Sequence, residues 1–320
     1  MAPPDMADEI ADRFEGTGIG GGGGGGGRHG GNKSRGGKSG GGGGRAKGRD
    51  VDLSRALSKL LRHQAASAGI QLDNEGYAPL DKVFQYGPIR SLKPTFDEIL
   101  TAVKESDKQR FALKPNPSTN PGLDESSTDP YHWLIRANQG HSIKLDSESL
   151  LKPISLPTST SPESEILPQG RVPVPPTVVH GTYFAFWPAI VESGGLKPMG
   201  RNHVHCSIGL PEDEQGVISG MRKDAEVLVY VDVERSIKEA GMKWWMSENG
   251  VVLTEGDENG LVPLKYFREV VGRKQDVGVL WKDGERVADL PDGLRIRAPM
   301  GKGPGRGGGR GGGRGRGRGH

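Results

Sequence analysis

Apolar residues recur at helical spacing in the first strongly patterned segment of the chain. In residues 51–63, VDLSRALSKLLRH, one face of a helix would gather Val51, Leu53, Leu57, Leu60 and Leu61. The pattern predicts an amphipathic helix over this segment. Arg62 and His63 come at its end, where cationic groups suit the negative end of the helix dipole, so the pair by itself favours a structural role.

Two further helices are expected in the first half of the chain. Pro79 suits the first turn of a helix, and it follows the turn-forming residues DNEG. Residues 95–104 predict another helix, because Thr95 is a good N-cap and Glu98 stands three residues later, as in a capping box.

A pair of strands follows these helices. Residues 110–113 and 131–136 read as strands, and the segment between them is rich in Pro, Asn and Ser, which predicts a loop. Helices followed by such a hairpin predict a small winged-helix-like unit. This shape is common among nucleic-acid-binding proteins, although shape alone does not establish function.

The second half of the chain has a different pattern. Residues 152–177 contain many prolines and hydroxyl groups with few apolar side chains, which predicts a linker. Beyond it, one helix is expected over 185–193, and short strands are expected at 178–179, 203–207, 227–233 and 251–253. The pattern is typical of a β-rich α+β domain.

Glycine content and charge separate two tails from the body of the protein. Residues 16–48 and 301–320 hold 32 of the 53 glycines. Residues 1–50 carry a net charge of +2 and residues 301–320 carry +6, and since the whole chain carries +3, about −5 remains for residues 51–300. Such tails cannot bury enough apolar surface to fold alone, so we expect them to be disordered.

Five parts are therefore expected along the 320 residues. They are a disordered Gly-rich basic tail (1–50), a winged-helix-like unit (51–151), a Pro/Ser-rich linker (152–177), an α+β domain (178–285) and a disordered Arg/Gly-rich tail (286–320). Because the last tail alternates Gly with Arg, its positive charge would attract RNA or DNA. Simple solvation of a low-complexity segment is the alternative.

Cysteine usage and the absence of sorting signals predict a reducing, intracellular setting. The single cysteine, Cys206, excludes an intrachain disulfide and a multi-cysteine zinc module. The chain starts with acidic residues where a secretion signal would need a basic stretch and an apolar run. Its most apolar run, 227–233, is too short to span a bilayer. We expect a soluble monomer in the nucleus, the cytoplasm or both, with no membrane partner.

Histidines and arginines are the candidate functional side chains. His203 and His205 would share one face of a strand and could bind zinc, but further ligands stand at no recognisable spacing, so no metal is expected and packing is the competing role. Arg136 precedes the donor-rich turn ANQGHS, which suits phosphate because a guanidinium matches two phosphate oxygens. A solvated turn is the alternative there.

Seven segments, taken in order, resemble the RNA 2′-phosphotransferase family, whose members remove the splice-junction 2′-phosphate from tRNA using NAD. Between residue 54 and about residue 270 they are LSKLLRH, DNEGYAPLD, RANQGHS, HGT, GGLKPMGRNHVHCS, GVISGMR and NGVVLT. The order of the whole set makes the resemblance specific. It implies an N-terminal winged-helix RNA lobe and a C-terminal NAD lobe of the ADP-ribosyltransferase type.

The resemblance also implies the residues of the site. The family's catalytic group would be Arg62, His63, Arg136 and Arg201. NAD, consumed as a co-substrate, would be bound by His180, Gly181, Thr182, His205 and Ser207. Gly181 would allow close approach of the backbone, which a side chain would block. The other partner would be tRNA bearing an internal 2′-phosphate.

A two-step reaction follows from the resemblance. The RNA 2′-phosphate attacks C1″ of the nicotinamide ribose and expels nicotinamide; O2″ then attacks phosphorus, releasing 2′-hydroxyl RNA and ADP-ribose 1″,2″-cyclic phosphate. A phosphate is already an anionic nucleophile, so the first step needs positioning, whereas the second needs charge stabilisation. His63 could contact the phosphate or transfer a proton.

Two other functions compete with this one. An ADP-ribosyltransferase could cap nucleic-acid phosphates and stop after the first step, or the chain could be a non-catalytic RNA-binding protein that acts through its Arg/Gly tail. The presence of Arg62, His63, Arg136 and Arg201 together favours the complete reaction.

Overall fold

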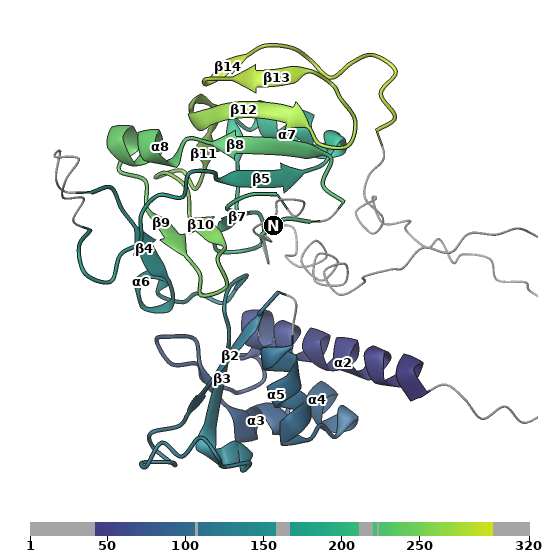
Figure 1. The fold of residues 1–320 in the computed structure, drawn as a ribbon, viewed down its shortest axis with the longest axis vertical. Coiled ribbons are helices and arrows are strands. Elements are labelled where there is room, and N and C mark those ends of the chain that lie inside the picture. Colours follow the sequence, from purple (N-terminus) through teal and green to yellow (C-terminus); the bar gives the residue numbers. More distant parts are fainter. Residues whose placement is uncertain (1–41, 106–107, 158–166, 211–219, 223, 297–320) are drawn as a thin grey trace, which may run out of the picture.

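The computed structural model describes residues 42–105, 108–157, 167–210, 220–222 and 224–296. Figure 1 shows an N-terminal region (42–143) and a C-terminal region (145–296), each with its own helices and strands. Both combine helices with antiparallel sheets, which confirms the predicted α+β class. Residues 1–41 and 297–320 of the predicted tails lie outside the described residues. Within the described ranges, no helix has the length and apolarity needed to cross a membrane.

Of the helices of the N-terminal region, the first begins earlier than the sequence predicts. The helices are α2 (Gly42–Lys59), the π-helical turn η1 (Leu60–Gln64), α3 (Leu80–Gln85), α4 (Gly87–Leu92) and α5 (Phe96–Lys104). Helix α2 starts at Gly42, whereas the sequence pattern predicts a helix from residue 51. Each residue added to an existing helix gains a backbone hydrogen bond, and the pairing of Arg49 Nε with Glu98 Oε1 of α5, at 2.5 Å, holds this extension in place.

A three-stranded sheet completes the N-terminal region and confirms the predicted hairpin. Its strands are β1 (Ala78–Pro79), β2 (Phe111–Pro115) and β3 (Trp133–Ala137), in the order β1-β3-β2, and the 3-10 turn η2 (Pro130–His132) precedes β3. Trp133, Ile135 and Ala137 are buried in the cluster of apolar side chains beneath the helices. Side chains alternate across a strand, so Arg136 faces away from this core.

The predicted capping box at the start of α5 is present. The Thr95 side chain accepts a hydrogen bond from Glu98 N at 3.2 Å, and the Glu98 carboxylate accepts one from Thr95 N at 2.8 Å. Two backbone N–H groups of the first turn, which have no partner inside the helix, are satisfied in this way.

Replacing Thr95 with alanine is therefore expected to lower the free energy of unfolding by about 1 kcal/mol. Thr101→Ala is the matched control, because it makes the same change at an exposed position inside α5. Urea unfolding at neutral pH would compare the two variants. Equal stabilities would show that the cap does not stabilise this helix.

The described part of the C-terminal region contains three sheets. One has the order β4 (Lys152–Ile154), β9 (Trp244–Met246), β10 (Val252–Thr254) and β7 (Val204–Cys206). A second has the order β14 (Glu285–Arg286), β13 (Val279–Lys282), β12 (Phe267–Gly272), β8 (Val227–Val231) and β5 (Val179–Thr182). The third pairs β11 (Val262–Pro263) with β6 (Gly195–Leu196).

Short helices cover these sheets. They are α6 (Ser147–Leu150), α7 (Trp187–Glu192), α8 (Val233–Ala240) and the 3-10 turns η3 (Phe184–Phe186) and η4 (Leu264–Tyr266). Helix α8 differs from the prediction, which gives a strand as far as Val233. Asp232 ends the strand, because its carboxylate accepts a hydrogen bond from Arg235 N at 2.9 Å and so caps the helix.

Two segments predicted to lie outside the domains contribute to the fold. The predicted linker starts with β4, an edge strand paired with β9, where Pro153 can be accommodated because an edge strand needs fewer N–H donors. Residues 287–296 fall in the predicted C-terminal tail, yet Leu290 and Leu294 pack against the main core of the C-terminal region. Local composition predicted flexibility here, and contacts with distant residues override it.

Candidate active site

The turn after β3 encloses the side chain of Arg62. This arginine is 1% exposed, and its carbonyl oxygen accepts hydrogen bonds from Ser142 N at 3.1 Å and Ile143 N at 3.2 Å. Gly140 has φ +87°, and a Cβ added there would lie 3.4 Å from the guanidinium carbon of Arg62. Glycine is therefore favoured at position 140 for two reasons. The backbone has a positive φ, and a side chain there would crowd the Arg62 guanidinium.

The same turn orients His63 and buries a second histidine. His63 Nδ1 lies 2.9 Å from Ser142 Oγ. His141 is 2% exposed, and its buried Nε2 has no hydrogen-bond partner among the described residues. Burial, reinforced by the positive charge of Arg62 and other nearby cationic side chains, lowers the pKa of His141 from 6.5 to about 3. His141 is therefore neutral at physiological pH.

Arg136 is held by contacts from both regions. Its Nη1 donates to Glu75 O at 3.1 Å, and its guanidinium carbon lies 4.7 Å from the ring centroid of Tyr77. Its Nη2 donates to Glu248 Oε2 at 2.8 Å, and Glu248 belongs to the turn between β9 and β10. The arginine thus sits where the N-terminal and C-terminal regions meet.

The segment that contains Arg201 is tied to the same turn. Asn202 N donates to His141 O at 2.9 Å, and Asn202 Nδ2 donates to Ile143 O at 2.7 Å. These bonds bring the backbone at Arg201 beside residues 141–143. The structure therefore places Arg62, His63 and the segment bearing Arg201 around one turn, and the strand before this turn carries Arg136.

His203 is fixed by a chain of hydrogen bonds. Ser147 Oγ donates to Glu255 Oε1 at 2.7 Å, so His203 Nε2, at 2.9 Å from Ser147 Oγ, acts as the donor to that oxygen. Burial lowers the pKa of His203, while the nearby Glu255 carboxylate opposes this shift. This histidine connects α6, β7 and the end of β10. In the described ranges, no group of three or more His, Cys, Asp or Glu side chains could hold a metal ion.

The residues predicted to bind NAD gather where β5 meets β7. Val179 and Ser207 exchange two backbone hydrogen bonds of 2.9 Å each. His180 Nδ1 donates to His205 O at 2.8 Å, and His205 Nδ1 donates to His203 O at 2.9 Å. Strand β7 begins only three residues after Arg201. The predicted NAD-binding residues therefore follow directly, along the chain, on the segment that carries Arg201.

The structure gives a different reason for glycine at position 181 than the sequence suggests. A Cβ added to Gly181 would lie 2.7 Å from Met221 Cγ and 2.9 Å from Ala225 Cβ. The space that a side chain would need is therefore filled by this chain's own residues. Internal packing against Met221 and Ala225 is therefore one reason for glycine at this position.

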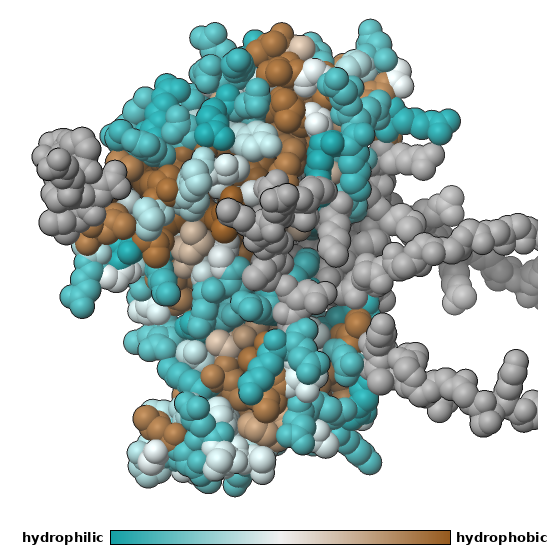
Figure 2. Space-filling view, viewed as in Figure 1, coloured by the Kyte–Doolittle hydropathy of each residue, from teal (hydrophilic) through white to brown (hydrophobic). Residues whose placement is uncertain are grey.

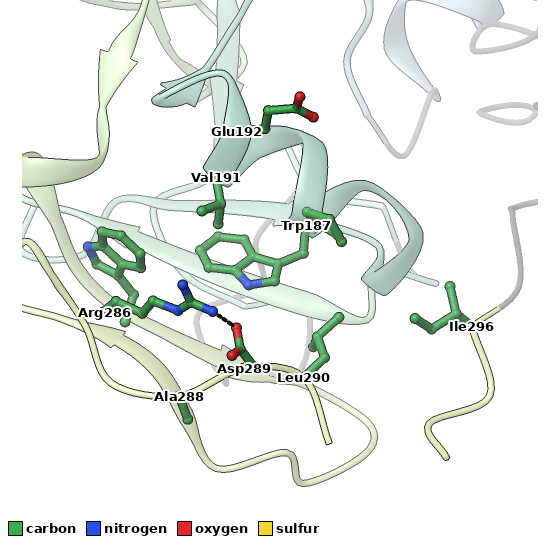
Figure 3. Close-up of a pocket in the computed structure, with 10 residues that line it drawn as sticks. Trp187, Val191, Glu192, Arg286, Ala288, Asp289, Leu290 and Ile296 are labelled. Atoms are coloured by element: carbon green, nitrogen blue, oxygen red, sulfur yellow. Dashed lines mark hydrogen bonds and ion pairs between the residues drawn. The ribbon is translucent and has the colours of Figure 1, made fainter. Parts of the chain in front are cut away.

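Two features of the surface help to locate the candidate site. On the face shown in Figure 2, the described residues between the two regions are mostly hydrophilic. A pocket of about 440 Å³ lies elsewhere, between α7 and the segment after β14 (Figure 3). Its lining includes Trp187, Trp281, Leu290 and the ion pair of Arg286 with Asp289. None of the predicted site residues lines this pocket. The candidate site is therefore identified by the side chains that converge on it and not by this pocket.

Sequence reasoning selected the arginines but missed residues that hold them. His141 and Ser142 stand in the segment RANQGHS, yet nothing in their spacing shows that one is buried among cationic groups and the other contacts His63. Tyr77 and Glu248 lie far from Arg136 in the sequence, and only the fold brings them to it.

An α+β fold that gathers guanidinium and imidazole groups between two regions defines a protein suited to binding phosphate. Comparison with known proteins identifies the class more closely, because the family described as RNA 2′-phosphotransferase, Tpt1/KptA family, matches residues 48–256. The chain belongs to this family and is therefore a phosphotransferase enzyme.

Relatives with the same function in their names cover most of the chain. The chain is 39% identical to tRNA 2′-phosphotransferase 1 of Bos taurus over 224 residues, which are 70% of this chain and 76% of the relative. It is 34% identical to tRNA 2′-phosphotransferase 1 of Mus musculus over 259 residues, 81% and 91% of the two chains. It is 37% identical to tRNA 2′-phosphotransferase of Saccharomyces cerevisiae over 225 residues, 70% and 84% of the two chains.

Proposed function

We propose that this protein removes the splice-junction 2′-phosphate from tRNA, with NAD as the co-substrate that takes up the phosphate. The observation that carries this proposal is the convergence of Arg62, His63 and the Arg201 segment on the turn that follows Arg136. The names of the relatives support tRNA as the substrate.

We assign separate tasks to the two regions. Residues 51–151 would form a winged-helix-like RNA lobe, residues 152–177 would connect it, and residues 178–285 would form an NAD lobe of the ADP-ribosyltransferase type. The helices followed by the hairpin of β2 and β3 support the first assignment, and the antiparallel sheets that carry β5 and β7 support the second. The basic tails would add RNA affinity through charge alone. The enzyme would act as an intracellular monomer, in the nucleus or the cytoplasm.

The chain's own residues would bind and orient the RNA phosphate. Arg62, Arg136 and Arg201 would hold its oxygens, because a guanidinium donates two parallel hydrogen bonds and keeps its charge at any physiological pH. Ser142 would orient the His63 imidazole toward the same phosphate. Since His141 is held neutral beside these cations, it would shape the site without adding another charge.

The residues around β5 and β7 fit NAD by the chemistry of their donor set. The half-buried His180, the Thr182 hydroxyl and neighbouring backbone groups are of the kinds that hydrogen-bond ribose hydroxyls and a carboxamide. The bond from His180 Nδ1 to His205 O fixes the ring of His180. When bound, NAD would supply the ribose carbon and hydroxyl to which the phosphate is transferred.

The test is a reaction with a short RNA that bears one internal 2′-phosphate, with and without NAD. We expect NAD-dependent loss of the phosphate, together with nicotinamide and a cyclic phosphate of ADP-ribose. The same RNA with a 2′-hydroxyl is the control and should release no nicotinamide. RNA that keeps its phosphate and gains ADP-ribose would show that only the first step occurs, and the absence of any NAD-dependent change would overturn the proposal.

A further inference from the structure

A rigid turn of the C-terminal region reaches the N-terminal region beside Arg136. Ser247 N donates to Val251 O and Val251 N donates to Ser247 Oγ, both at 2.9 Å, so the turn is closed by its own hydrogen bonds. Asn249 Nδ2 donates to Lys108 O at 2.8 Å, which fixes the turn to the N-terminal region. Glu248 therefore approaches Arg136 from an anchored backbone.

Glu248 lies on the solvent side of the guanidinium. The side chain of Arg136 is 12% exposed and that of Glu248 is 54% exposed, and Oε2 accepts from Nη2 at 2.8 Å. The inner side of Arg136 is already occupied, because Nη1 donates to Glu75 O and the Tyr77 ring packs against the guanidinium. The Glu75 carboxylate is bound to Lys114 Nζ at 2.7 Å. An anion that comes from solvent to Arg136 would thus meet the Glu248 carboxylate first.

We propose that Glu248 is an internal competitor of the RNA 2′-phosphate, and so a residue that sets the affinity for RNA. This inference rests on the proposed phosphate-binding role of Arg136. In the RNA-free protein, the carboxylate occupies the Nη2 donor and holds the guanidinium in place. When RNA binds, the phosphate takes this donor and the half-exposed carboxylate turns into solvent.

The competition follows from charge. A carboxylate carries one negative charge and here uses one oxygen, whereas a terminal phosphate carries nearly two charges and offers three oxygens. The phosphate can therefore displace the Glu248 carboxylate from Arg136. The negative charge of Glu248 stays nearby, however, and its repulsion weakens the binding of the phosphate. Arg136 stays positioned after the exchange, since the contacts with Glu75 O and Tyr77 do not involve Glu248.

Glu248→Gln removes the charge and keeps an oxygen that can accept from Nη2. We expect the Kd for a short RNA with one internal 2′-phosphate to fall roughly three- to tenfold at low salt, with kcat within twofold of the wild-type value. The difference in Kd between the wild type and Glu248→Gln should decrease as the salt concentration increases, because ions screen exposed charges. Glu234→Gln is the matched control; it removes one carboxylate from an exposed ion pair with Lys238 on α8 and should leave the Kd unchanged.

Fluorescence anisotropy without NAD would measure binding of this RNA and of the same RNA with a 2′-hydroxyl, and turnover would be measured separately. A lower Kd of Glu248→Gln for the phosphorylated RNA alone supports the inference. The inference would be overturned by an unchanged or increased Kd, by an equal decrease in Kd for both RNAs, or by a fall in kcat with unchanged Kd. A wild-type protein that binds the phosphorylated RNA selectively but shows no NAD-dependent turnover would refute the proposed function and leave the role of Glu248 standing.

Discussion

Replacing Arg136 with glutamine is expected to lower kcat/KM for 2′-phosphate removal by about 10²-fold or more. The proposed reaction redistributes charge on a phosphate, and a donor fixed in advance toward such charge is worth roughly this factor in other enzymes. Arg136 meets that condition, because the hydrogen bond to Glu75 O and the packing of the Tyr77 ring hold its guanidinium in place. Arg136→Lys should recover only part of the loss, since an ammonium lacks the planar fork that fits two phosphate oxygens.

Arg235→Gln is the matched control for this prediction. It removes an exposed guanidinium that pairs with Glu239 within α8, away from the candidate site, and should leave kcat/KM within twofold. Steady-state rates of nicotinamide release would be compared at saturating NAD. If Arg136→Gln retained near wild-type activity while folding normally, Arg136 would have no part in the reaction.

Acidification below pH 6.5 is expected to destabilise the protein, because His141 is buried in its neutral form. Burial is the main cause that lowers its pKa from 6.5 to about 3, and the charge of Arg62 adds to it. Between these two pH values the unfolded chain binds a proton that the folded protein excludes, so the free energy of unfolding falls by about 1.4 kcal/mol per pH unit from this group. The contribution is complete above pH 6.5 and is lost progressively as the pH falls toward 3.

Urea unfolding at pH 8, 6.5, 5.5 and 4.5 would measure this slope. The His141→Gln variant cannot take up a proton at this position. Its free energy of unfolding should therefore fall less steeply with decreasing pH than that of the wild type, by about 1.4 kcal/mol per pH unit. His132→Gln, which removes an imidazole from η2 just before β3, is the control and tests whether a change in slope is specific to His141. Identical slopes for the wild type and His141→Gln would mean that His141 does not govern acid stability.

Local sequence signals predicted the elements whose structure depends on nearby residues. The capping box of Thr95 and Glu98 and the hairpin of β2 and β3 are confirmed, because each is encoded by neighbours along the chain. Helix α8 was missed for a related reason. The apolar run before it continues through Val233, and the capping role of Asp232 is visible only when its carboxylate is seen to accept from Arg235 N.

The ends of the folded segments depend on contacts between residues far apart in the sequence, which local patterns do not reveal. Composition placed residues 42–50 and 287–296 in tails, yet Arg49 pairs with Glu98, and Leu290 and Leu294 pack on a distant core. Likewise, β4 exists because β9, about ninety residues later, provides its hydrogen-bond partner. In each case the energy that orders the segment comes from residues far away in the sequence.

For the candidate site, the chemical types of the side chains and their order can be read from the sequence alone. Guanidinium and imidazole groups at positions 62, 63, 136 and 201, and their resemblance to one enzyme family, needed no coordinates. The fold is needed to see that the turn at 140–143 links these segments, that His141 is buried uncharged among them, and that Glu248 faces Arg136 from the other region. Burial and charge pairing depend on which surfaces meet in three dimensions, and a one-dimensional pattern does not specify that.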